Sequence, residues 1–110
     1  MIGKSLVTTV DCNNPTFLKT FAKLKPHQAK EARFMLGLLI MLDTDNPPGK
    51  LHFHSLQNKL APSVLDPTKK VKIYTIHITN NDSHKASFTL ESGVAYMRVC
   101  GEHDSIDKTP

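Results

Sequence analysis

Histidine is frequent in this sequence, and most of the histidines fall where proton-transfer chemistry is commonly done. There are six in 110 residues, and four of them, from residue 54 onward, lie at expected strand ends or loop edges: His54, His77, His84 and His103. Imidazoles titrate near neutral pH, so a pair of them can move protons at a phosphodiester, one as the base and the other as the acid. A nearby lysine or arginine would hold the phosphate.

Some of the histidines also have simpler interpretations. His52 and His54 are two residues apart, so on an extended segment both would lie on one side. Such a pair can chelate a metal ion, but no Cys, Asp or Glu at a recognisable ligand spacing completes the set, and we expect no metal site. His27 and His52 are more simply exposed to solvent or hydrogen-bonded to the backbone, and His84 is placed to cap a turn.

Three short segments with the period of a β-strand must position these side chains. In residues 71–79 apolar and polar residues alternate, which predicts a strand with one buried face and with His77 pointing away from the core. Residues 85–90 repeat the pattern, and Ser92-Gly93 predicts a tight turn into a third strand over residues 94–100. The result is an antiparallel meander that ends just before the last histidine.

The first half of the chain predicts one strand and two helices. Residues 5–10 are rich in β-branched side chains, which favours a strand. Asn14 as N-cap and Pro15 at the first helical position predict a helix, and a second one is expected from Pro26 to about Leu42. The stretches predicted to be irregular are residues 44–49, 61–70 and the polar tail 102–110.

Length and composition indicate one domain, residues 1–110, with a modest core. The net charge of +4 favours an anionic partner such as nucleic acid. The basic candidates for binding it are a cluster next to the first meander strand and two residues expected on its open face: Lys69, Lys70, Lys72, Lys85 and Arg98.

Two cysteines without a disulfide framework, and no charged segment ahead of an apolar stretch, predict a cytoplasmic protein. The longest apolar run, residues 34–42, is too short to span a membrane. No glycine-rich phosphate loop is present, so we expect no nucleotide cofactor.

Four motifs in this order resemble the RelE/ParE superfamily of bacterial toxins: NPTFLKTFAKLKP, HSLQNK, IHITNND and SGVAYMRVCGEHDSI. Within it, the chain looks most like the YafQ-like branch of ribosome-dependent messenger-RNA endonucleases. The resemblance covers nearly the whole chain. It implies an α+β fold in which an N-terminal strand and two helices pack on a twisted antiparallel sheet of three to four strands.

The resemblance also implies which residues do the chemistry. The catalytic histidines of the branch match His54, His77 and His103, and its turn aspartate matches Asp82 if this turn is one residue longer than usual, or otherwise Asn81. General acid and base roles would be shared among these side chains without a metal or another cofactor. The expected partners are messenger RNA on the ribosome and a cognate antitoxin.

Three departures from the pattern concern substrate binding. Ser83 and Asp107 stand where the branch has aromatic residues that would stack on bases, and an arginine typical of RelE-type sites is missing, for which Lys85 or Arg98 could substitute. Acidic residues beside His103 would repel a polyanion. The alternatives are therefore the same fold acting on DNA, as a gyrase poison or a nicking endonuclease, and a weakened homologue that only binds.

Overall fold

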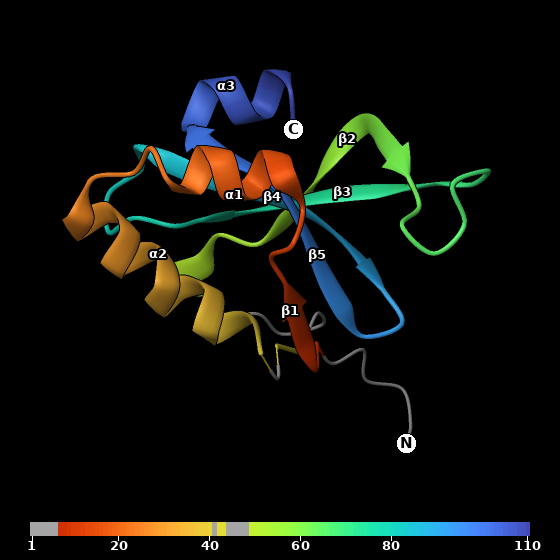
Figure 1. Ribbon diagram of the computed structural model, residues 1–110, viewed down its shortest axis with the longest axis horizontal. Helices are drawn as coiled ribbons and strands as arrows, with labels where there is room; N and C mark the ends of the chain where they lie inside the picture. Colours follow the sequence, from red (N-terminus) through yellow and green to blue (C-terminus); the bar gives the residue numbers. More distant parts are fainter. Residues whose placement is uncertain (1–6, 41, 44–48) are drawn as a thin grey trace.

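The computed structural model describes residues 7–40, 42–43 and 49–110, and within them five strands form one mixed sheet in the order β1-β5-β4-β3-β2 (Figure 1). Strands β3, β4 and β5 are the predicted meander, each antiparallel to the next. Their bounds and those of the outer strands are Thr9–Asp11 for β1, His54–Pro62 for β2, Lys70–His77 for β3, His84–Glu91 for β4 and Val94–Glu102 for β5.

Both predicted helix starts are confirmed. Helix α1, Pro15–Phe21, is capped by Asn14, whose Oδ1 accepts hydrogen bonds from the backbone N–H groups of residues 16 and 17 at 2.8 and 3.2 Å. Helix α2, Pro26–Leu39, ends about one turn earlier than predicted because the backbone of Ile40 is extended. The predicted loop over residues 44–49 lies outside the described residues except at its last position.

The turn between β4 and β5 is confirmed as well. Ser92 and Gly93 both have positive φ, 51° and 81°, as the central pair of a two-residue hairpin turn requires. Such a turn twists in the same sense as the strands that it joins. This pairing fixes the register of β4 against β5 and therefore the place at which β5 ends, directly before His103.

Other parts of the fold differ from the prediction. Strand β1 pairs with β5 in parallel, and β2 joins the other edge, so the sheet is mixed and five-stranded rather than antiparallel with three to four strands. The predicted first strand covered residues 5–10, of which 5 and 6 lie outside the described residues. Residues 103–108 form a further helix, α3 (His103–Lys108), instead of a polar tail, because Ile106 is buried against the sheet.

The two faces of the sheet differ in chemistry. Helices α1 and α2 cover the first face (Figure 1), where apolar side chains such as Ile76, Phe88 and Met97 form the core with Phe17 and Met35. The second face is polar and still mostly buried: Thr75, His77, Lys85, Ser87 and Thr89 are between 0% and 7% exposed. The prediction that His77 points away from the apolar core is right, but the side chain is buried, since α3 contacts β4 and β5 on this side.

A carboxylate holds the loop after β2 to the end of β4. Glu91 accepts hydrogen bonds from the hydroxyl of Ser63, from the backbone N–H of Val64 at 3.0 Å and from the hydroxyl of Thr89 at 3.0 Å. Burial by itself would raise the pKa of Glu91, but these hydrogen bonds outweigh it and lower the pKa below its ordinary value. In the described part of the chain, no helix is long and apolar enough to cross a bilayer.

Candidate functional site

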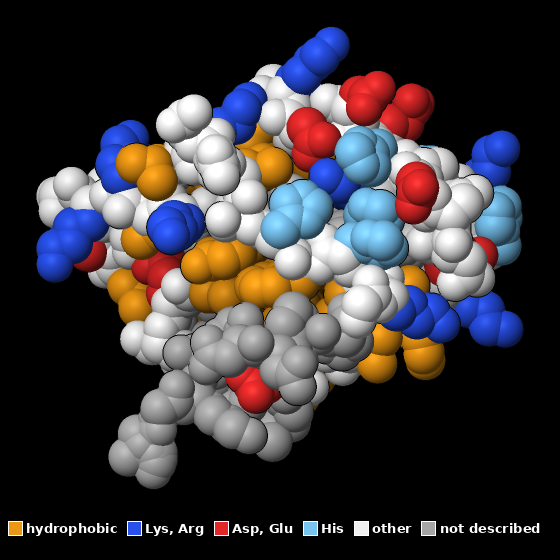
Figure 2. Space-filling view, turned by 180° about the vertical axis from the view of Figure 1, so that it is seen from behind, with side chains coloured by type: hydrophobic (Ala, Val, Ile, Leu, Met, Phe, Trp, Pro, Cys, Tyr) orange, Lys and Arg blue, Asp and Glu red, His pale blue; other side chains and the backbone are white. Residues whose placement is uncertain are grey.

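Three imidazoles meet at the end of β3, on the second face of the sheet. The ring of His77 stacks on that of His52 with 4.2 Å between centroids, and the ring of His103 approaches it edge-on at 5.4 Å. We call these three residues the histidine cluster. Figure 2 shows histidine side chains gathered on this face, with a basic side chain between them and carboxylates around them.

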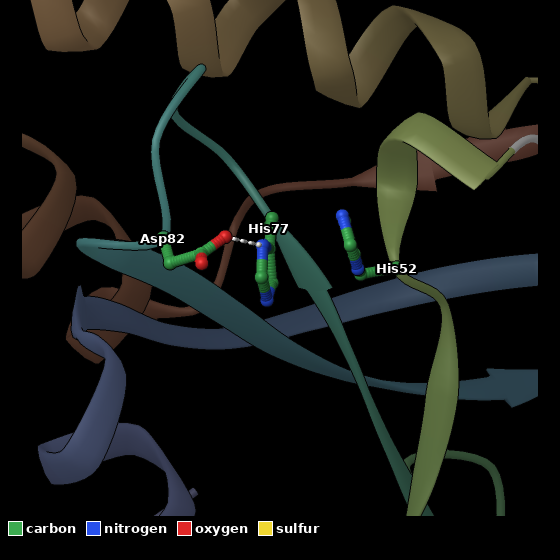
Figure 3. Close-up of side chains that lie close together, drawn as sticks. All are labelled: His52, His77 and Asp82. Carbon is green, nitrogen blue, oxygen red and sulfur yellow. Dashed lines mark ion pairs between the residues drawn. The ribbon is translucent and has the colours of Figure 1, made fainter.

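His77 is the centre of the cluster. It is the last residue of β3, and its Nδ1 lies 3.3 Å from Asp82 Oδ1 in the turn that leads to β4 (Figure 3). Burial lowers the pKa of His77, and the neighbouring His52 ring lowers it further, while Asp82 acts in the opposite direction. His77 is therefore held as a neutral imidazole with an available lone pair at neutral pH.

The sequence interpretation missed His52, which it treated as exposed to solvent and unrelated to the site. His52 follows a short 3-10 helix, η1 (Gly49–Leu51), and its φ of 50° lies in the left-handed region, which is uncommon outside glycine. Its N–H bonds to the carbonyl of Gly49 at 3.1 Å. His52 stacks on His77 and His54 reaches Thr75, so both side chains lie on the second face of the sheet, as the sequence predicted, although the backbone between them is not regularly extended.

His54, a predicted catalytic residue, stands outside the cluster. It pairs across the strands with Thr75, and its Nε2 lies 3.4 Å from the Thr75 hydroxyl. Thr75 precedes His77 by two residues on the same face, a separation of about 7 Å along the strand. His54 therefore flanks the site, exposed, without contacting the other imidazoles.

The position of His103 is fixed by the first turn of α3. Its backbone N–H donates to the carbonyl of Ser83 at 2.9 Å, which joins α3 to the turn that carries Asp82. Its Nδ1 lies 3.4 Å from both Asp104 Oδ1 and Asp107 Oδ2. The structure thus brings together three of the four predicted catalytic residues, His77, Asp82 and His103.

Lys85 belongs to the site but is not free to bind a ligand. Its side chain is 2% exposed, and its Nζ forms an ion pair with Asp107 Oδ1 at 2.9 Å. The prediction that Lys85 lies exposed on the open face is therefore wrong, and a phosphate can meet this lysine only after Asp107 moves away. α3 brings the carboxylate of Asp107 to the place that a phosphate would need.

The other predicted basic residues lie elsewhere. Arg98 is the extra residue of a bulge in β5, and its guanidinium donates to the carbonyl of Pro110 at 3.4 Å, beside the start of α1. Lys69, Lys70 and Lys72 are exposed at the other end of β3 from His77. Lys72 and His77 are five residues apart on one strand, about 17 Å. The predicted basic cluster therefore lies next to β3 but away from the histidine cluster.

An open hollow of about 480 Å³ adjoins His103, and its rim is acidic. Asp82, Glu102 and Asp104 line it together with Ser83, His84 and His103. His84 Nδ1 lies 2.6 Å from the hydroxyl of Ser83, so it belongs to the turn, as the sequence predicted. The rim repels polyanions unless a cation or a rearrangement of the carboxylates offsets the charge.

Two sets of side chains in this region offer ligand atoms within 4.8 Å of one another: His52, His77 and Asp82, and separately His103, Asp104 and Asp107. The site can therefore perform two kinds of chemistry. A pair of neighbouring imidazoles can take and give protons. Imidazoles combined with a carboxylate can also bind a divalent transition metal.

No protein-family model matches this chain, and no curated protein sequence or solved structure is significantly similar to it. The α+β architecture and the histidine cluster are the observations on which the proposals below depend.

Proposed function

We propose that this protein is the toxin of a type II toxin–antitoxin pair, with a RelE-like fold, and that it cleaves messenger RNA at the ribosome by acid–base catalysis without a metal. The observation that carries the proposal is the pair His77 and His103. These residues come from separate segments, and their rings lie 5.4 Å apart beside an open hollow. The four sequence motifs that resemble the YafQ-like branch give the substrate class.

In this proposal His77 is the general base. Its lowered pKa leaves the ring neutral, so its lone pair can accept the proton of an RNA 2′-hydroxyl. The 2′-oxygen then attacks the adjacent phosphorus, and the bond from phosphorus to the 5′-oxygen breaks. The products are a 2′,3′-cyclic phosphate and a 5′-hydroxyl.

His103 is the general acid in the same step. A proton on its Nδ1 has carboxylate acceptors at 3.4 Å on Asp104 and Asp107, which orients the ring and leaves Nε2 for the substrate. The doubly protonated ring gives its Nε2 proton to the departing 5′-oxygen. Asp82 acts on the base instead, by holding the His77 ring through Nδ1.

Lys85 is the cation that could stabilise the developing charge on the phosphate. In the structure its Nζ is bound by Asp107, so a substrate phosphate must replace that carboxylate. RNA binding is therefore coupled to a movement of Asp107 away from Lys85. Free RNA is expected to be cut slowly, and RNA positioned by the ribosome much faster.

The antitoxin is proposed to cover exposed apolar side chains on the two N-terminal helices. Phe34 of α2 and Leu18 of α1 are 56% and 52% exposed. The chain between Leu18 and Phe34 contains several lysines, which supply a positive charge for an acidic antitoxin segment. Such surfaces are typical of sites covered by a partner.

Expression in a bacterial host tests the proposal. Wild-type protein is expected to stop growth and translation, and His77→Ala or His103→Ala to restore both. His27→Ala is the matched control, because His27 is an exposed histidine on α2, and it should remain toxic. A toxic His103→Ala protein at wild-type levels would overturn the catalytic role of His103.

The second assay identifies the nucleic acid. Purified protein with translating ribosomes and EDTA should produce cuts that end in a 2′,3′-cyclic phosphate. DNA has no 2′-hydroxyl, so cleavage of DNA would need an activated water molecule. Nicking of supercoiled plasmid that EDTA abolishes, with RNA left intact, would replace this proposal by a metal-dependent DNA nuclease.

A further inference from the structure

We propose that His52, His77 and Asp82 bind one Zn²⁺ ion. The three side chains come from three separate segments, the residue after η1, the end of β3 and the turn before β4. They lie next to one another, with the Asp82 carboxylate facing His77 and the His52 ring beside it (Figure 3). Each offers one ligand atom, and these atoms all lie within 4.8 Å of one another. The site goes beyond the proposed nuclease activity and does not depend on it.

The spacing of the His77 and Asp82 ligand atoms agrees with tetrahedral coordination. Zinc bonds of about 2.0–2.1 Å to imidazole and carboxylate place neighbouring ligand atoms about 3.3 Å apart. His77 Nδ1 and Asp82 Oδ1 are already 3.3 Å apart. The rings of His52 and His77 are stacked with 16° between their planes, so the His52 side chain must rotate for its nitrogen lone pair to point at the same ion.

Two of the three ligands are free to make that adjustment. Asp82 is 83% exposed, and His52 lies on the surface, while His77 is fixed in the strand. The ion can therefore enter from solvent past these two exposed side chains, which adjust around the fixed His77 ring. Two imidazoles and one carboxylate form a donor set that zinc accepts, with a fourth position left for water.

The second set of possible ligands, His103, Asp104 and Asp107, is less suitable for a cation. Asp107 Oδ1 is 2.9 Å from the Lys85 ammonium, which would lie beside the bound ion and repel it. Asp82 has no such cationic partner among the ion pairs of the described residues. The first set is therefore the preferred site.

Zinc at this site has a consequence for activity, which rests on the proposed function. An ion bound at Nδ1 of His77 would use the lone pair there and leave the ring proton on Nε2, so the ring could no longer accept the 2′-hydroxyl proton. Bound Zn²⁺ should therefore inhibit RNA cleavage, and EDTA should restore it.

The test is a titration of the full chain, tag removed and treated with EDTA, with zinc sulfate against a chromophoric chelator. One zinc per chain is expected, together with a higher midpoint of thermal unfolding. His52→Asn and Asp82→Asn should each weaken binding by more than about 100-fold, since even hydrogen-bonded partners of metal ligands are worth about 10- to 100-fold.

His54→Asn and His84→Asn are the matched controls, because both remove a nearby histidine that is outside the set; zinc binding should not change. Circular dichroism of each variant verifies folding. Wild-type protein that binds no zinc would overturn the proposal. Loss of the zinc in His103→Asn, with binding retained in His52→Asn, would also overturn it, because the ion would then lie at the second set.

The outcomes separate this site from the proposed function. Zinc binding by a protein that cuts no RNA keeps the site and rejects the nuclease. RNA cleavage by a protein that binds no zinc keeps the nuclease and rejects the zinc site. If cleavage requires zinc, the site stands and the metal-independent mechanism is wrong.

Discussion

The ion pair between Lys85 and Asp107 gives the sharpest prediction, because one partner is buried and the other is partly exposed. Lys85 is 2% exposed and Asp107 is 36% exposed, with 2.9 Å between Nζ and Oδ1. Removing one partner of a buried pair costs about 3–5 kcal/mol, because the remaining charge stays buried. Water reaches this pair through Asp107, so for Asp107→Asn we expect a loss of about 2–3 kcal/mol in the free energy of unfolding.

The converse substitution should behave differently. Lys85→Met fills the same buried space without a charge, and the Asp107 carboxylate that it leaves is still hydrated. We expect a change of less than about 1 kcal/mol. The difference in free energy of unfolding between the two variants, rather than either value alone, tests whether the cost comes from leaving the buried Lys85 charge unpaired.

Urea unfolding followed by far-ultraviolet circular dichroism measures both variants. For Asp107→Asn the midpoint of thermal unfolding should fall by roughly 10 °C or more. Asp104→Asn is the matched control, since Asp104 also lies beside His103 but is 94% exposed and forms no ion pair with Lys85; its effect should stay within about 0.5 kcal/mol. Equal losses in Asp107→Asn and Lys85→Met, or no loss in Asp107→Asn, would refute the reasoning.

Three further predictions concern the fold. Glu91→Gln should destabilise the protein by about 2–4 kcal/mol at neutral pH, because an amide cannot accept all the donors that the carboxylate binds; Glu102→Gln, at an exposed position, should not. Folding lowers the pKa of Glu91, so this carboxylate stabilises the folded protein above its unfolded pKa of about 4.3 and stops doing so as pH falls through its folded pKa. The free energies of unfolding of the wild-type protein and Glu91→Gln should therefore converge in acid. Asn14→Ala should cost about 1 kcal/mol in urea unfolding by removing the cap of α1, and a loss below about 0.3 kcal/mol would contradict that role. Ile106→Ala should cost about 2–4 kcal/mol and release α3 from the sheet, detected as faster amide exchange at residues 103–108; unchanged exchange would show that Ile106 does not hold α3.

Local signals in the sequence predicted the elements of the fold well. Asn14-Pro15 and Pro26 start the two helices, and Ser92-Gly93 turns β4 into β5. Each of these depends on a backbone preference of one or two residues, which is the same wherever the segment packs in the fold. The parallel pairing of β1 with β5 had no such signal, because its partner lies more than eighty residues further along the chain.

The site was predicted in part for the same reason. Alternation along β3 put His77 on the polar face, and the last strand ends at His103, so both were found. His52 was missed because alternation shows only that it shares a side with His54, and not that this segment brings its ring onto the end of β3. The exposure of Lys85 was misjudged because alternation predicts on which face of the sheet a side chain lies, but not which other segment covers that face.

The sequence by itself therefore determined where the helices begin, how the meander turns and which side of it each histidine is on. Only the tertiary structure decided that His52 rather than His54 contacts His77, and that Asp107 of α3 forms an ion pair with Lys85. The first group depends on torsional preferences and side-chain alternation, which are properties of neighbours in the chain. The second depends on how distant segments return to the sheet, where burial and ion pairing are decided by contacts that no short stretch of sequence contains.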